Sequence, residues 1–153
     1  MTTAELGDRA AIVDVVSRYT YSLDERDWTL LDQVFSADAV GRYGGPGGPP
    51  LEGRDAIVAF IRSFLDGCGP TQHLLGNHMV EVAGEEATAR CKARVYHHGA
   101  GERAALTPYE CFGVYRDRLR RTAEGWRITE RVFDVQLAVG DIAILQPAPA
   151  ATV

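Results

Sequence analysis

Four long strand-like segments, separated only by short turns, fill the second half of the chain. They cover residues 71–82, 86–98, 107–121 and 125–138, and glycine-containing turn signals lie between them at 84–85, 99–101 and 123–125. Strands joined by so few residues pair antiparallel, because a parallel pair needs a long crossover connection. This half of the chain therefore predicts a sheet of long antiparallel strands.

The first half of the chain has mainly helical patterns. Apolar side chains recur at helical spacing over residues 7–24, and shorter helices are expected over 28–35 and 54–65. A short strand is expected at 39–43, and the glycine- and proline-rich run 44–50 after it is typical of a loop. Helices followed by an antiparallel sheet indicate an α+β fold. We expect a cone-shaped, curved sheet packed on three N-terminal helices, with a pocket inside the cone.

Length and charge narrow the class of protein. The 153 residues suit one domain, which we place at 1–140, with 141–153 as a C-terminal extension. The net charge of -5 disfavours nucleic acid or an anionic membrane as a partner, because both bind clustered Lys and Arg. The N-terminus lacks a signal-peptide pattern, no apolar run approaches the ~20 residues of a membrane span, and the three cysteines have no redox or metal spacing. A cytoplasmic protein is the simplest interpretation.

Asp24 and His73 are the first candidates for chemistry. Asp24 lies about 20° from Val13 around an ideal helix axis, so it shares the apolar face, where an unpaired carboxylate is costly. His73 lies in the stretch PTQHLLGNH at the start of a strand, and strict alternation places Asn77 on the same face. Each also has an ordinary structural interpretation: Asp24 could cap the helix near Trp28, and His73 could be a hydrogen-bonded core histidine.

Two further polar residues lie on later strands. His97 continues the inward-facing set that starts at Ala87, so we expect it in the interior near a strand end. Glu130 shares a face with Trp126 and either looks into the pocket or pairs with a neighbouring arginine. The four histidines have no helical i, i+4 spacing and no accompanying cysteine pair, so we expect no metal site.

Three segments resemble the SnoaL-like branch of the nuclear transport factor 2-like superfamily, namely YTYSLDERDWTLLDQVF, TQHLLGNHMVEVAGEEATARCKARVYHH and YRDRLRRTAEGWRI. The resemblance covers about residues 7–138 and implies a cystatin-like α+β barrel. In the scytalone dehydratase pattern of this superfamily, an Asp at the end of the first helix orients a His that takes a proton from the substrate. Asp24 and His73 match these positions, His97 matches a second His, and Tyr43 matches a Tyr after the second helix. Tyr19 matches a Tyr that precedes the Asp in the related bile-acid dehydratase.

The resemblance implies a lyase or isomerase of the dehydratase or cyclase type that needs no cofactor. His73 would be the general base, Asp24 would fix its tautomer, and His97 or Tyr43 would protonate a leaving hydroxyl or hold a carbonyl. The substrate is expected to be small and largely apolar, polyketide-like or steroid-like. The residues expected to contact it are Tyr43, Tyr19, Asn77, Phe60, Phe64 and Glu130.

Two other functions remain open. An epoxide hydrolase or cyclase on the same fold uses an Asp–Arg–Asp arrangement, but Arg94 is followed two residues later by Tyr96 rather than by an Asp. A non-catalytic small-molecule binding module would need no oriented base at all. We also expect a homodimer or homotrimer, because the outer face of the sheet carries Val, Tyr and Phe among its charges.

Overall fold

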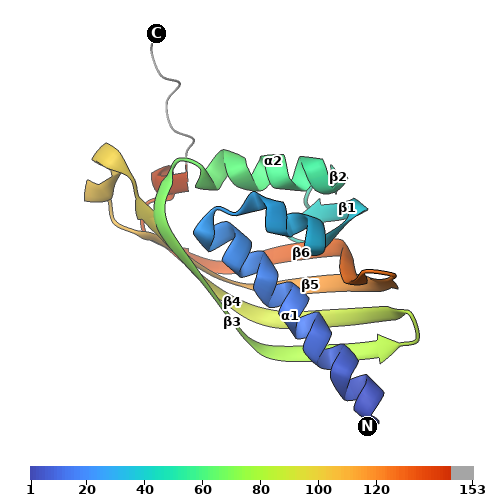
Figure 1. The fold of residues 1–153 in the computed structure, drawn as a ribbon. Coiled ribbons are helices and arrows are strands. Elements are labelled where there is room, and N and C mark those ends of the chain that lie inside the picture. Colours follow the sequence, from blue (N-terminus) through green and yellow to red (C-terminus); the bar gives the residue numbers. More distant parts are fainter. Residues whose placement is uncertain (146–153) are drawn as a thin grey trace.

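One six-stranded sheet forms the body of the protein, with the strand order β2-β1-β6-β5-β4-β3 (Figure 1). The computed structural model describes residues 1–145. The four long strands of the predicted antiparallel sheet are present as β3 to β6. The strands are β1 (Phe35–Arg42), β2 (Leu51–Glu52), β3 (Cys68–Ala83), β4 (Glu86–Gly99), β5 (Tyr109–Thr122) and β6 (Gly125–Val139).

Two α-helices cover one side of the curved sheet (Figure 1). The first, α1 (Thr3–Glu25), begins four residues earlier than the sequence pattern predicts, because Thr2 and Glu5 form a capping box. The second, α2 (Arg54–Leu65), matches its prediction. The third expected helix, 28–35, is only a 3₁₀ helix at Trp28–Gln33, because β1 already begins at Phe35.

The sheet is mixed rather than purely antiparallel. Strand β1 runs parallel to β6, with Phe35 opposite Ile128 and Arg42 opposite Val132. The long connection through α2 and β3 to β5 permits this pairing, since parallel neighbours need a crossover. The α+β class and the antiparallel pairing of β3 to β6 are confirmed, and the β1–β6 pairing, which the sequence pattern did not predict, makes the sheet mixed.

A buried ion pair lies in the core between the sheet and α1. The guanidinium of Arg131, fully buried, donates two hydrogen bonds of 2.8 and 2.7 Å to the Asp117 carboxylate. The same guanidinium lies 4.1 Å from the ring centroid of Tyr19 and 4.4 Å from that of Tyr115. Pairing with Asp117 stabilises the buried charge of Arg131, and the guanidinium then packs against both tyrosine rings.

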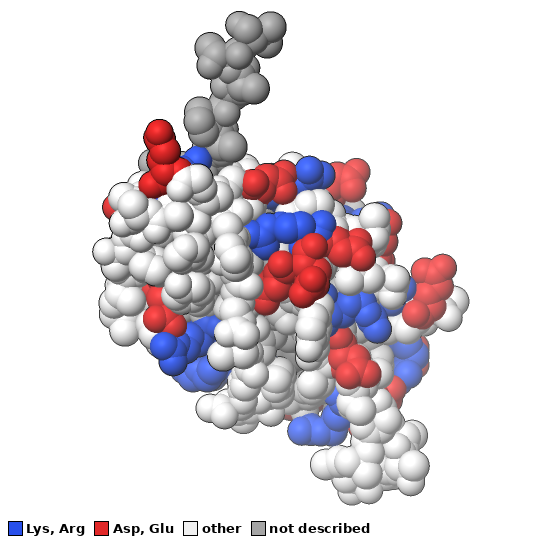
Figure 2. All heavy atoms as spheres, turned by 60° about the vertical axis from the view of Figure 1, so that its left-hand side comes forward, with Lys and Arg blue, Asp and Glu red and all other residues white. Residues whose placement is uncertain are grey.

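Residues 142–145, part of the predicted extension, form a 3₁₀ helix whose Ile144 is fully buried. The rest of that extension, 146–153, lies outside the described residues. Among the described helices, none is long and apolar enough to span a membrane. On the face drawn in Figure 2, basic and acidic side chains intermix instead of forming a patch of one sign.

Candidate active site

The Asp24 carboxylate at the end of α1 contacts the start of β3 through three hydrogen bonds. Its Oδ1 lies 2.6 Å from Nδ1 of His73 and accepts a bond of 2.9 Å from the Thr71 hydroxyl. Its Oδ2 accepts the backbone N–H of His73 at 2.8 Å. Burial raises the pKa of Asp24, but the bonds from His73 and Thr71 outweigh burial and lower it overall. Asp24 is therefore ionised at neutral pH.

The bond to Asp24 determines which nitrogen of His73 is free. An ionised carboxylate only accepts hydrogen bonds, so in the neutral ring Nδ1 carries the proton and Nε2 keeps a lone pair. The His73 side chain is 5% exposed, and its ring lines an internal cavity. In this arrangement the other ring nitrogen, Nε2, is directed away from the carboxylate, which is the orientation that a general base requires.

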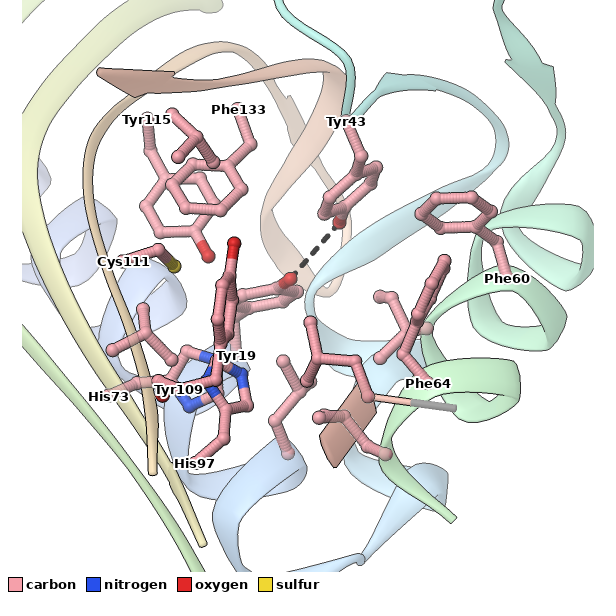
Figure 3. Close-up of a pocket in the computed structure, with 16 residues that line it drawn as sticks. Tyr19, Tyr43, Phe60, Phe64, His73, His97, Tyr109, Cys111, Tyr115 and Phe133 are labelled. Atoms are coloured by element: carbon pink, nitrogen blue, oxygen red, sulfur yellow. Dashed lines mark hydrogen bonds between the residues drawn. The ribbon is translucent and has the colours of Figure 1, made fainter. Parts of the chain in front are cut away.

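The cavity has a volume of about 180 Å³ and lies between the sheet and the helices (Figure 3). His73 and His97 lie on the β3 and β4 side of it, and Phe60 and Phe64 lie on the α2 side. Much of the wall is aromatic, and the Tyr and Phe residues that line it are Tyr19, Tyr43, Phe60, Phe64, Tyr109, Tyr115 and Phe133. Such a wall suits a flat apolar molecule.

His97 enters the interior as its strand parity predicts and is 5% exposed. Its Nδ1 lies 3.1 Å from the carbonyl oxygen of Tyr109, and its ring centroid lies 6.1 Å from that of His73. Burial, above all, lowers the pKa of His97 from 6.5 to about 4. His97 is therefore neutral at neutral pH, donates Nδ1–H to the Tyr109 carbonyl and offers Nε2 as an acceptor.

Tyr19 and Tyr43 place a pair of hydroxyl groups in the cavity wall, 3.1 Å apart (Figure 3). Burial raises the pKa of both hydroxyls, so both keep their protons. Tyr19 also interacts with Tyr115 and Arg131, so Tyr43 is the hydroxyl of the pair that can turn its proton toward a ligand oxygen. The pair can hold a carbonyl or an enolate oxygen.

Two of the predicted contact residues lie away from the cavity. Asn77 is exposed because the β3–β4 register shifts between Gly76 and Met79, and a one-residue bulge turns every later side chain to the opposite face. Glu130 follows a similar shift against β5 and lies 3.5 Å from Arg118 in an ion pair. Both predictions of substrate contact are wrong for this geometry.

Sequence reasoning missed Tyr115 and the Arg131–Asp117 pair behind it. Tyr115 shares the parity of Cys111 on β5, and both line the cavity, so strand alternation was a usable signal. Arg131 had no such signal, because the bulge before it reverses the parity of β6. Among the described residues, no three His, Cys, Asp or Glu side chains are grouped as a metal site requires.

The chain belongs to the SnoaL-like domain family, whose model matches residues 4–132. Among known proteins it is 33% identical over 133 residues to the uncharacterized protein Rv2910c of Mycobacterium tuberculosis. That match covers 86% of this chain and 88% of the relative.

Solved structures share the fold at low sequence identity. Kfla4162 from Kribbella flavida superposes with a TM-score of 0.82 at 22% identity, covering 92% of this chain and 98% of that one. A Novosphingobium aromaticivorans protein named "Putative Scytalone Dehydratase" gives 0.81 at 22% identity, covering 100% and 99%. The type 2 hexachlorocyclohexane dehydrochlorinase LinA gives 0.77 at 18% identity, covering 97% of each chain. A further Novosphingobium aromaticivorans structure, described as an ntf2-like protein with a cystatin-like fold, gives 0.71 at 29% identity, covering 87% and 84%, so the architecture is of this kind.

Proposed function

We propose that this protein is a cofactor-independent lyase or isomerase that removes a proton from carbon with His73 as the base. The observation that carries the proposal is the Asp24–His73 hydrogen bond of 2.6 Å at the wall of a cavity rich in aromatic side chains. A buried carboxylate that fixes the tautomer of a histidine also stabilises the imidazolium formed when that histidine takes a proton. If Asp24 served only to cap a helix, it would not need His73 as a hydrogen-bond partner.

The proton can be followed through each step. Nε2 of His73 takes a proton from a carbon next to a carbonyl, and the free hydroxyl proton of the Tyr19–Tyr43 pair holds the developing enolate oxygen. The His73 imidazolium then returns the proton, either to a leaving hydroxyl, which departs as water, or to another carbon, which completes an isomerisation. His97, with its lowered pKa, is a weak candidate for the acid and a good acceptor for a substrate hydroxyl.

The cavity restricts the substrate to a small uncharged molecule. Among the described residues that line it there is no Lys, Arg, Asp or Glu, so a carboxylate or phosphate would be buried without a partner. Its volume of about 180 Å³ is close to the ~150 Å³ of a protein cavity that holds benzene. A single-ring ketone or phenol of polyketide type fits this space, whereas a steroid would extend beyond it.

Deuterium exchange tests the proposal without knowledge of the natural substrate. Single-ring ketones are incubated with the protein in D₂O, and loss of the proton next to the carbonyl is followed by NMR. We expect exchange that Asp24→Asn slows by about 10²–10⁴-fold, because the wrong tautomer then faces the cavity. Asp14→Asn, a change at an exposed position of the same helix, is the matched control. Binding without any exchange across the panel would refute catalysis and leave a small-molecule binding module.

The epoxide-opening alternative receives no support from the site. Arg94 lies on the outer face and pairs with Glu110, away from the cavity. Asp24, the carboxylate bonded to the cavity-lining His73, is occupied by three hydrogen bonds. Epoxide opening by a cavity carboxylate would therefore need a different arrangement of these strands.

A further inference from the structure

Arg26 occupies the residue position that ends α1 in a left-handed conformation. Its backbone angles are φ 57° and ψ 26°, and its N–H donates to the Leu23 carbonyl at 3.3 Å. Glycine is the usual residue at such a helix end, because it takes a positive φ without steric cost. An arginine here indicates that the side chain contributes something that glycine cannot.

The Arg26 guanidinium joins the ends of both helices to the start of β3. It donates to the carbonyl of Leu23 in α1, to the carbonyl of Leu65 at the end of α2 at 3.2 Å, and to the carbonyl of Gly69 in β3 at 2.9 Å. It also donates to the Thr71 hydroxyl at 2.9 Å. The planar donor fork thus fixes the strand segment that presents the catalytic histidine relative to the helix that presents its carboxylate.

Thr71 extends this contact to the Asp24–His73 pair. An arginine only donates and an ionised carboxylate only accepts, so the direction of both Thr71 bonds is determined. Its hydroxyl accepts from Arg26 and donates to Oδ1 of Asp24, each at 2.9 Å. The same Oδ1 accepts Nδ1–H of His73. One continuous chain of hydrogen bonds therefore runs from Arg26 to the imidazole ring.

We propose that Arg26 is a positioning residue that, through Thr71 and the end of α1, holds the Asp24 carboxylate on Nδ1 of His73. It does not line the cavity, so it acts through the pair rather than on a substrate. Without the guanidinium, the Thr71 hydroxyl can rotate and the helix end loses a cap. The His73 ring then populates the tautomer that carries its proton on Nε2. In that tautomer Nε2 has no lone pair with which to accept a proton from a ligand in the cavity. The catalytic consequence rests on the proposed function, but the hydrogen bond can be measured without a substrate.

The test is the tautomer of His73, read from the ¹⁵N chemical shifts of its ring nitrogens in the free protein at mildly alkaline pH. The decisive variant is Arg26→Gly, because glycine suits the backbone at this position and the change removes the side chain that carries the guanidinium. We expect a several-fold rise in the Nε2–H tautomer in a protein that still folds, because glycine at this positive φ offsets part of the stability lost with the capping hydrogen bonds. A residue that only caps the helix would change the stability and leave the tautomer as it is. Arg62→Gln removes the same charge from an exposed position on α2 and serves as the control.

Thr71 provides an independent second test should the Arg26 variant fold poorly. Thr71→Val removes both hydrogen bonds and should shift the tautomer, while Thr71→Ser keeps the hydroxyl and should restore it. If Thr71→Val and Arg26→Gly both leave the tautomer unchanged while Asp24→Asn alters it, the role of Arg26 is refuted and the proposed function stands.

Asp24→Asn also separates a failure of this inference from a failure of the proposed function. If this variant too leaves the His73 tautomer unchanged, the hydrogen bond of 2.6 Å does not form in solution and both proposals fail. With a working substrate, Arg26→Gly should lower kcat by about tenfold or more with KM nearly unchanged, as misplacement of a reacting group does.

Discussion

Protonation of His97 should make the fold sensitive to mild acid. Burial lowers its pKa from 6.5 to about 4, helped by the nearby His73 and Arg26, while the Tyr109 carbonyl and Asp24 favour the charged form. In the unfolded chain the ring regains its ordinary pKa, so between about pH 6.5 and 4 the unfolded state binds more protons than the folded state. The stability that the neutral ring contributes is therefore present above this window and is lost as the pH falls through it.

The magnitude follows from the two pKa values of His97. The difference between 6.5 and about 4 corresponds to about 3 kcal/mol when fully expressed. Between about pH 7 and pH 4.5, roughly 2 kcal/mol of this should disappear. That is a large part of the stability of a typical domain, which lies between about 5 and 15 kcal/mol.

Urea unfolding across this pH range measures the effect in wild type and in two variants. In His97→Gln the side chain can still donate to the Tyr109 carbonyl but does not titrate. Between about pH 7 and pH 4.5 the free energy of unfolding of this variant should therefore fall by about 2 kcal/mol less than that of wild type. His98→Gln changes the next residue, which faces the opposite side of β4 with Nδ1 3.3 Å from the Tyr96 hydroxyl, and should keep the wild-type pH dependence. Parallel pH curves for wild type and His97→Gln would refute this reasoning.

Three further changes test the surroundings of the cavity. Asp117→Asn leaves the fully buried Arg131 without its counter-charge and should cost about 3–5 kcal/mol in chemical unfolding; a cost below ~1 kcal/mol would contradict the paired-charge argument. Tyr43→Phe removes the hydroxyl 3.1 Å from that of Tyr19 and should slow deuterium exchange by about 10²-fold, whereas an unchanged rate would exclude this pair from oxyanion binding. Phe64→Ala should widen the cavity and shift exchange toward two-ring ketones in competition assays, and an unchanged preference would show that this ring does not limit substrate size.

Regular segments were predictable from local pattern alone. The alternation of small apolar and charged residues along β4 placed His97 inside, since that strand has no irregularity opposite β5. The helical spacing of α1 likewise placed Asp24 on the buried side, where it meets His73. Both predictions needed only the geometry of a single element.

Bulges explain the residues that were misplaced. A register shift changes the face of every residue beyond it. On β3 the pair Gly76-Asn77 was a usable signal, because Asn77 has φ 55° and glycine in a strand often marks a bulge, whereas the residues of β6 give no such sign. Asn77 therefore moved out of the expected pocket, and on β6 Glu130 moved out while Arg131 moved in. The parallel pairing of β1 was equally invisible to local pattern, because it depends on contacts between distant parts of the chain.

The pairing of β1 with β6 also has a consequence for how the protein is made. Strand β1, which leads into Tyr43, leaves the ribosome early, but its partner strand is almost the last part of the sheet to be synthesised. Until then β1 can pair only with the two-residue β2 and presents an open edge to other chains. Because such distant contacts slow folding, the Tyr43 wall of the cavity should close last, and newly made chains should depend most on chaperones at that stage.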